Sequence, residues 1–166
     1  MLRVYDIGEQ FVDLFERGKT VAGTLEIVGA TFEADEPTIF GTVNEEYVAR
    51  EIQWYESMSL SVDDIPGGAP AIWRQISSRG GRINSNYGYL FFSGANGRQI
   101  NRVVEAICKN IETRRAIAIY TRPSIHFEWD LNGMHDFICT NAVQYLVRDG
   151  KLEVVVQMRS NDVVFG

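Results

Sequence analysis

Two apolar runs near the end of the chain, joined by Asp149-Gly150, constrain the fold more than any other feature. Residues 141–148 and 151–158 are strand-like and rich in valine. An Asp-Gly pair between two such runs is the strongest short-range signal for a two-residue β-hairpin turn. The chain is therefore expected to contain an antiparallel hairpin, and the fold must include a sheet.

The register of this hairpin gives one cysteine polar neighbours. If Arg148 pairs with Lys151, continuing the ladder places Cys139 opposite Ser160 and next to Arg159. A β-bulge would shift this pairing by one residue. In either register the Cys139 thiol lies beside an Arg-Ser pair at one end of the sheet.

Hydrophobic spacing in the rest of the chain predicts helices interleaved with short strands. This mixture of helices with mostly antiparallel strands is typical of the α+β class. With 166 residues, 45% of them apolar, the chain is expected to form one domain over 1–166 whose core needs no disulfide. We expect helices from Asp6 to Gly18 and over 44–57, 72–78 and 97–110, and strands over 24–32 and 116–120.

The composition excludes several classes of function. A net charge of −6 disfavours non-specific nucleic-acid binding, which needs a basic surface. The sequence has no secretory signal and no apolar run long enough to cross a membrane, so we expect no membrane partner and a cytoplasmic location. Cys108 adjoins the apolar stripe of a predicted helix and is interpreted as core or near-surface filler. No metal is expected, because no known ligand spacing fits the cysteines and histidines, Cys108, Cys139, His126 and His135.

Two side chains are candidates for chemistry. The Cys139 thiol would be a nucleophile if the neighbouring guanidinium favours its ionised form, and a small buried hydrophobe otherwise. Glu51 shares a predicted helical stripe with apolar Val48, Ile52 and Tyr55. A carboxylate on such a face could pass protons at neutral pH, or it could extend to water at the edge of the stripe.

Basic and aromatic residues suggest a binding site for an anionic, flat ligand. Guanidinium groups with a hydroxyl can clamp a phosphate, although scattered surface charge is the alternative. The basic candidates lie at strand ends and are Lys19, Arg114, Arg115 and Arg159, with Ser160. Aromatic rings could line a pocket for a base or a pterin, or they could be core. These are Trp54, Trp73, Tyr87 and Tyr145.

Several longer stretches resemble a known family. They are Gly29-Ala30-Thr31-Phe32, Ala34-Asp35-Glu36-Pro37, Arg50-Glu51-Ile52-Gln53-Trp54-Tyr55, Asn84-Ser85-Asn86-Tyr87-Gly88, Arg114-Arg115, Tyr120-Thr121-Arg122-Pro123-Ser124, Asp136-Phe137-Ile138-Cys139-Thr140-Asn141 and Met158-Arg159-Ser160-Asn161-Asp162. In this order, over nearly the whole chain, they resemble the thymidylate synthase superfamily and, within it, the deoxycytidylate hydroxymethylases of T-even bacteriophages. Thr140 after the cysteine, where ordinary synthases carry His, and the lack of a Pro pair before it match that branch.

The resemblance implies a thymidylate synthase-like fold and a role for each motif residue. Cys139 would add to C6 of dCMP, and Glu51 would organise water and proton transfers. The one-carbon unit would come from 5,10-methylenetetrahydrofolate, and hydration would give 5-hydroxymethyl-dCMP. The implied phosphate ligands are Lys19, Arg159 and Ser160, with Arg114 and Arg115 reaching in from the second subunit of a homodimer. The implied cofactor-side residues are Trp73, Tyr87 and Asp162.

The family also continues well beyond Gly166, so the resemblance implies a chain truncated at its C-terminus. A complementing C-terminal fragment would then be a further partner, and the chain alone is expected to have little or no turnover. Two alternatives stay open. One is a dUMP C5-methyl- or hydroxymethyltransferase of the same superfamily, and the other is a catalytically incomplete nucleotide-binding fragment. If the chain is phage-encoded, the implied location is the cytoplasm of an infected bacterium.

Overall fold

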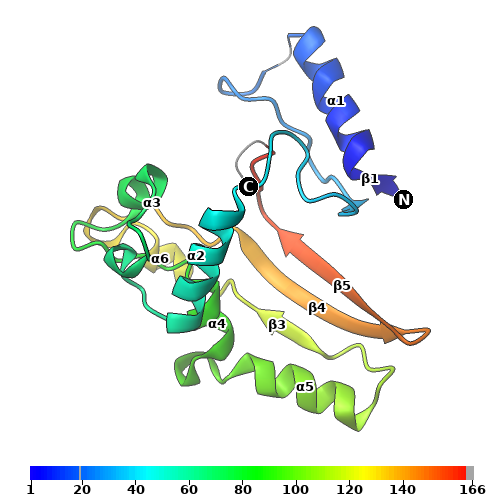
Figure 1. The fold of residues 1–166 in the computed structure, drawn as a ribbon, viewed down its shortest axis with the longest axis vertical. Helices are drawn as coiled ribbons and strands as arrows, with labels where there is room; N and C mark the ends of the chain where they lie inside the picture. Colours follow the sequence, from blue (N-terminus) through cyan, green and yellow to red (C-terminus); the bar gives the residue numbers. More distant parts are fainter. Residues whose placement is uncertain (19, 164–166) are drawn as a thin grey trace. The chain divides into compact units, whose positions relative to one another are not determined.

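The computed structural model describes residues 1–18 and 20–163 of the chain (Figure 1). Lys19, one of the predicted phosphate ligands, lies outside the described residues. The chain divides into two compact units, one formed by residues 1–44 and 161–163 and the other by Glu45–Ser160. Both contain helices and strands, which confirms the predicted α+β class. The single domain over 1–166 stays a prediction.

The first unit contains one longer helix and a short parallel strand pair. Strand β1 (Leu2–Arg3) pairs with β2 (Phe32–Glu33), and helix α1 (Val4–Glu16) follows β1 directly. The helix begins two residues before Asp6, which we had expected to cap it. The Asp6 carboxylate instead lies in the first turn and accepts a hydrogen bond from the Arg3 N–H at 2.8 Å. Acidic groups are favourable at both places, because both face the unpaired N–H groups of the first turn.

The predicted strand over 24–32 is wrong for all but its last residue. Only Phe32 of this range belongs to a strand, and Val21 and Thr24 form an isolated bridge just before it. Gly23 (φ +83°) and Gly29 (φ +72°) adopt left-handed backbone conformations. Such residues interrupt an extended chain, so the apolar alternation between them does not make a strand.

The second unit is organised around an antiparallel three-stranded sheet. Its order is β3 (Ile117–Ile119), β4 (Thr140–Arg148) and β5 (Lys151–Met158). Arg148 pairs with Lys151, so the predicted hairpin is confirmed. Helix α5 (Gln99–Lys109) packs beside β3 (Figure 1).

A β-bulge changes the register near the catalytic candidate. Val143 pairs with Val156 as the hairpin turn requires, but Thr140 pairs with Met158 because Asn141 is an extra residue. Consequently Cys139 lies opposite Arg159 rather than Ser160, and its carbonyl accepts the Arg159 N–H at 2.9 Å. The sequence allowed this shift but could not place the bulge.

The helices of the second unit surround two apolar clusters. One cluster lies between α4, α5 and the sheet and includes Leu90, Val103 and Ile138, and the other is centred on Trp54, which is fully buried. The aromatic run at 87–92 is helical. The remaining helices are α2 (Glu45–Ser57), α3 (Ala71–Ile76), α4 (Tyr87–Phe92) and α6 (Ile125–Glu128), with single 3₁₀ turns at Val62–Asp64, Gly94–Asn96 and Leu131–Gly133.

Helix α2 buries a different face from the predicted one. Val48 and Ile52 of the expected stripe are 42% and 49% exposed, whereas Trp54 is fully buried. Tyr55 and Glu51 are half-buried. Val62, Ile65 and Ile83 of the following segment cover Trp54, and α4 packs on the side of α2 that carries Tyr55.

Candidate active site

The Cys139 thiol lies where the chain enters strand β4, and it is partly exposed. Three polar atoms surround its sulfur: Arg159 Nη2 at 3.5 Å, Ser160 Oγ at 3.7 Å and the Phe137 carbonyl oxygen at 3.8 Å. This is the predicted juxtaposition of thiol, guanidinium and hydroxyl. The alternative, a cysteine sealed in apolar side chains, does not describe these contacts.

The Arg159 guanidinium is held in place from several directions. Its Nη2 donates to the Phe137 carbonyl at 2.8 Å, and its Nε donates to the Ile138 carbonyl at 3.2 Å. Its Nη1 donates to Ser160 Oγ at 3.1 Å, and its carbon lies 5.1 Å from the centre of the Phe137 ring. A fixed cation beside a partly exposed sulfur is the environment in which a cysteine acts as a nucleophile.

Tyr87 connects the corner formed by Cys139, Arg159 and Ser160 to helix α4. Its hydroxyl oxygen accepts the backbone N–H of Thr140 at 3.3 Å, the residue directly after Cys139. Burial raises the pKa of Tyr87, so the phenol stays protonated at neutral pH. Its ring packs edge-on against Tyr55 and Tyr120, with ring centres 5.8 and 5.6 Å away.

Glu51 belongs to a second polar group on helix α2. Tyr47, one turn earlier, donates its hydroxyl to Glu51 Oε1 at 2.8 Å, and Trp73 Nε1 donates to the Tyr47 hydroxyl at 2.8 Å. Burial raises the pKa of Tyr47 to about 12. Burial and the adjacent Glu51 carboxylate also raise the pKa of Tyr55. Glu51 is therefore held in a hydrogen-bonded position.

Aromatic side chains join the Glu51 group to the Cys139 corner. Tyr55 lies next to Glu51 and packs on Tyr87, which in turn bonds the residue after Cys139. The second unit thus brings together Glu51, Trp73, Tyr87 and Cys139 through direct neighbours, along with Arg159 and Ser160.

Two of the other predicted site residues lie at the end of β3 that is remote from the start of β4. Arg114 and Arg115 are exposed and precede β3, whose other end lies beside the start of β4, as the pairing of Ile119 with Ala142 shows. Asp162 belongs to the first unit. A pocket of about 330 Å³ in the second unit is lined by none of the predicted site residues; Arg122, Glu128 and Asn84 are among its walls.

Sequence reasoning missed several residues that support the site. Tyr47 could have been found, because it lies four residues before Glu51 on the same helical face. Asp136 and Asn86 could not, since their partners come from distant segments. In the part of the chain that the structure describes, no helix has the length and apolar character to cross a bilayer.

The chain belongs to the thymidylate synthase family. The family model described as thymidylate synthase matches residues 13–166. A solved structure of thermostable thymidylate synthase A from Bacillus subtilis is similar to 75% of this chain, with a TM-score of 0.55 and 26% identity, and the match covers 46% of that structure. The predicted thymidylate synthase-like fold is therefore confirmed.

Within this family, the chain is 55% identical over 148 residues to the deoxycytidylate 5-hydroxymethyltransferase of Enterobacteria phage T4. That match covers 89% of this chain and 60% of the relative. Thymidylate synthase from Bacillus licheniformis is 28% identical over 158 residues, covering 89% of this chain and 55% of that protein. The chain thus spans about 60% of the phage relative's length and 55% of the bacterial one's.

Proposed function

We propose that this chain carries the nucleophile half of a deoxycytidylate 5-hydroxymethyltransferase site, which transfers a one-carbon unit to C5 of dCMP and hydrates it. The observation that carries the proposal is the Cys139 sulfur lying 3.5 Å from the fixed Arg159 guanidinium. The 55% identity to the phage T4 enzyme favours dCMP as the substrate.

The chemistry starts at Cys139. Its thiolate forms a bond to C6 of the pyrimidine while the C5–C6 double bond opens, which leaves C5 electron-rich and able to attack a one-carbon electrophile. A base then removes the C5 proton, and expulsion of the sulfur at the end restores the double bond. Glu51, which accepts the Tyr47 hydroxyl at 2.8 Å, would organise water for these proton transfers. Loss of the C5 proton together with departure of the one-carbon carrier, as tetrahydrofolate, would leave an exocyclic methylene on C5, and water adding to that carbon as the sulfur leaves C6 would give the hydroxymethyl product.

The cofactor side would be formed by aromatic residues. 5,10-Methylenetetrahydrofolate would supply the one-carbon unit when bound. Trp73 fits such a group because it is only half-buried and its indole N–H is already satisfied by Tyr47, so the ring can offer an apolar face to a pterin. Tyr87 would line the same side, and Asp162 is the third proposed contact.

The nucleotide phosphate would be bound by Arg159 and Ser160, with Lys19. A homodimer partner would add its own copies of Arg114 and Arg115. The exposure of both arginines, at the end of β3 away from the β4 start, is consistent with a role toward another chain. The net charge of −6 makes a local basic cluster the electrostatic feature that would attract this anion.

A complementing segment is proposed because β5 is exposed on both faces, including the face that continues the core. Leu152, Val154 and Val156 share the sheet face of the core residues Val143 and Tyr145, yet they are 59%, 48% and 53% exposed. Apolar surface of this kind is usually buried against another element. An additional family segment on this face would complete the fold, and without it the chain would bind nucleotide but turn over slowly.

Tritium release from the base tests the proposal. The chain, in excess, is incubated with [5-³H]dCMP or [5-³H]dUMP, with and without methylenetetrahydrofolate. We expect release from dCMP that C139S abolishes and C108S, the matched change at the other thiol, retains. Release from dUMP alone would instead support the dUMP enzyme. Absence of release, together with protection of Cys139 from alkylation by dCMP, would support a binding fragment. Absence of both would refute the proposal.

A further inference from the structure

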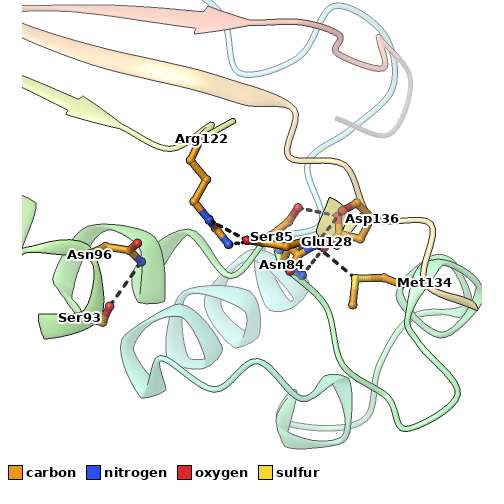
Figure 2. Close-up of polar contacts among 8 residues, drawn as sticks. All are labelled: Asn84, Ser85, Ser93, Asn96, Arg122, Glu128, Met134 and Asp136. Carbon is orange, nitrogen blue, oxygen red and sulfur yellow. Dashed lines mark hydrogen bonds and ion pairs between the residues drawn. The ribbon is translucent and has the colours of Figure 1, made fainter. Parts of the chain in front are cut away.

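A buried carboxylate close to Cys139 in sequence has no role in the proposed chemistry. Asp136 lies three residues before Cys139 and is only 4% exposed. Figure 2 shows it directed at the loop that carries Asn84 and Ser85. Its Oδ2 accepts the backbone N–H groups of Asn84 and Ser85 at 2.6 and 2.8 Å, and its Oδ1 accepts the Ser85 hydroxyl at 2.5 Å.

Burying a carboxylate is costly unless hydrogen bonds replace its hydration. Three short bonds from one loop do so here, and the two partners are 51 and 52 residues away in sequence. The Asn84 side chain adds a bond to the Asp136 carbonyl at 3.3 Å. The segment leading into Cys139 is therefore attached to this loop chiefly through Asp136, with one further contact from Asn84 Nδ2 to Met134 Sδ at 3.3 Å.

The same loop is attached to the other site elements. Asn86 is fully buried and donates to the Trp54 and Ser59 carbonyls at 3.0 and 2.8 Å, which joins the loop to the end of α2. Its Oδ1 accepts the Tyr89 N–H at 2.8 Å and so caps α4. The residue that follows Asn86 is Tyr87, whose hydroxyl bonds the backbone after Cys139.

We propose that Asp136 is a positioning residue, which holds the Cys139 segment at the α2–α4 junction so that the sulfur lies beside Arg159. This inference deepens the proposed function and rests on Cys139 being the reactive thiol. Asp136 touches neither the sulfur nor any proposed substrate ligand in the described contacts. It acts through the loop, and its hydrogen bonds rather than its charge are what the geometry uses.

The asparagine variant separates these two properties. In D136N the amide oxygen can still accept both backbone N–H groups, and the amide nitrogen can donate to the Ser85 hydroxyl, which both donates and accepts. D136A removes all three bonds and leaves two buried N–H groups without an acceptor. Asp64 offers a matched control, because it accepts the Ser59 hydroxyl at the same 2.5 Å on an exposed surface.

Alkylation of the Cys139 thiol tests whether its sulfur lies beside the Arg159 guanidinium. In a C108S background, Cys139 is the only thiol of the chain. Its reaction rates with anionic iodoacetate and neutral iodoacetamide are compared. The ratio of the iodoacetate rate to the iodoacetamide rate increases with positive charge at the sulfur, whereas a change in the exposure of the sulfur alters both rates together. We expect R159A to lower the ratio about fivefold, which is the scale of one screened charge at contact distance. This comparison needs no turnover.

We expect D136A to lower the ratio nearly as far as R159A, and D136N and D64A to keep the original value. If near-UV circular dichroism shows that D136A is not folded, S85A takes its place. We expect S85A to lower the rate ratio by about twofold or more. An unchanged ratio in D136A, or in S85A where that variant is used, would refute the positioning role. Equal loss in D136N and D136A would also refute it, because charge would then be the cause. If R159A leaves the ratio unchanged, the active-site proposal itself fails.

Discussion

Gly88 allows helices α2 and α4 to approach each other closely, and adding one methyl group there should separate them. A Cβ built on Gly88 would lie 1.8 Å from the Tyr55 carbonyl oxygen and 2.9 Å from its Cα, whereas real contacts are essentially never below 3.0 Å. The helices would have to move apart by roughly 1 Å or more, because the obstructing atoms are backbone and cannot repack. This movement would pull Tyr55 and Glu51 away from Tyr87.

We expect Gly88→Ala to lower the free energy of unfolding by about 3 kcal/mol, the upper range for overpacking. The small gain in helix propensity from Gly to Ala, about 1 kcal/mol, does not offset this loss. Label release should fall roughly 100-fold, as expected for a displacement of about 1 Å at reacting groups. Urea unfolding followed by circular dichroism measures the stability. Gly80→Ala is the control, since its Cβ would meet no atom within 4 Å. Equal stabilities for the two variants would contradict this account of the α2–α4 contact.

Two further predictions concern stability at alkaline pH and the exposed apolar residues of β5. Because the pKa of Tyr47 rises from 10.0 to about 12 in the fold, the unfolded chain loses this proton first, and stability should fall as pH rises from 10 to 12. Tyr47→Phe should reduce that fall in urea titrations, whereas Tyr5→Phe, at a tyrosine that is 72% exposed, should leave it unchanged. Val156→Lys should reduce binding of the apolar dye ANS, because it places a charge between the exposed Leu152 and Val154 and the core side of the sheet. Gln157→Lys, on the other face of the strand, should not; equal effects would count against a binding face at Val156.

The hairpin shows which structural features the local sequence determines and which it does not. Asp149-Gly150 fixed the turn and therefore the register up to Ala142, since each pair in an antiparallel ladder follows from the one before. The bulge at Asn141 depends on packing beyond the two strands, and it decided which residue faces Cys139. Both registers place the thiol near Arg159 and Ser160, so the one-residue shift in pairing does not change the main site prediction.

The burial of α2 shows where sequence reasoning failed. Apolar spacing indicated Val48 and Ile52 as the buried positions, although both are largely exposed in this chain. Trp54 is covered by residues 62–83, and Tyr55 is covered by α4, whose close approach depends on the missing side chain of Gly88. A single glycine in an aromatic run gives no local sign that a second helix will rest on it.

The sequence by itself determined the α+β class, the family motifs and the set of chemically competent side chains, because these depend on residue type and short-range order. Only the tertiary structure decided how they are held: Asp136 to the Ser85 loop, Asn86 to the end of α2, and Tyr87 to the backbone after Cys139. Each of these bonds joins segments 27 to 53 residues apart. Such pairings follow from the packing of the whole unit, which no local pattern encodes.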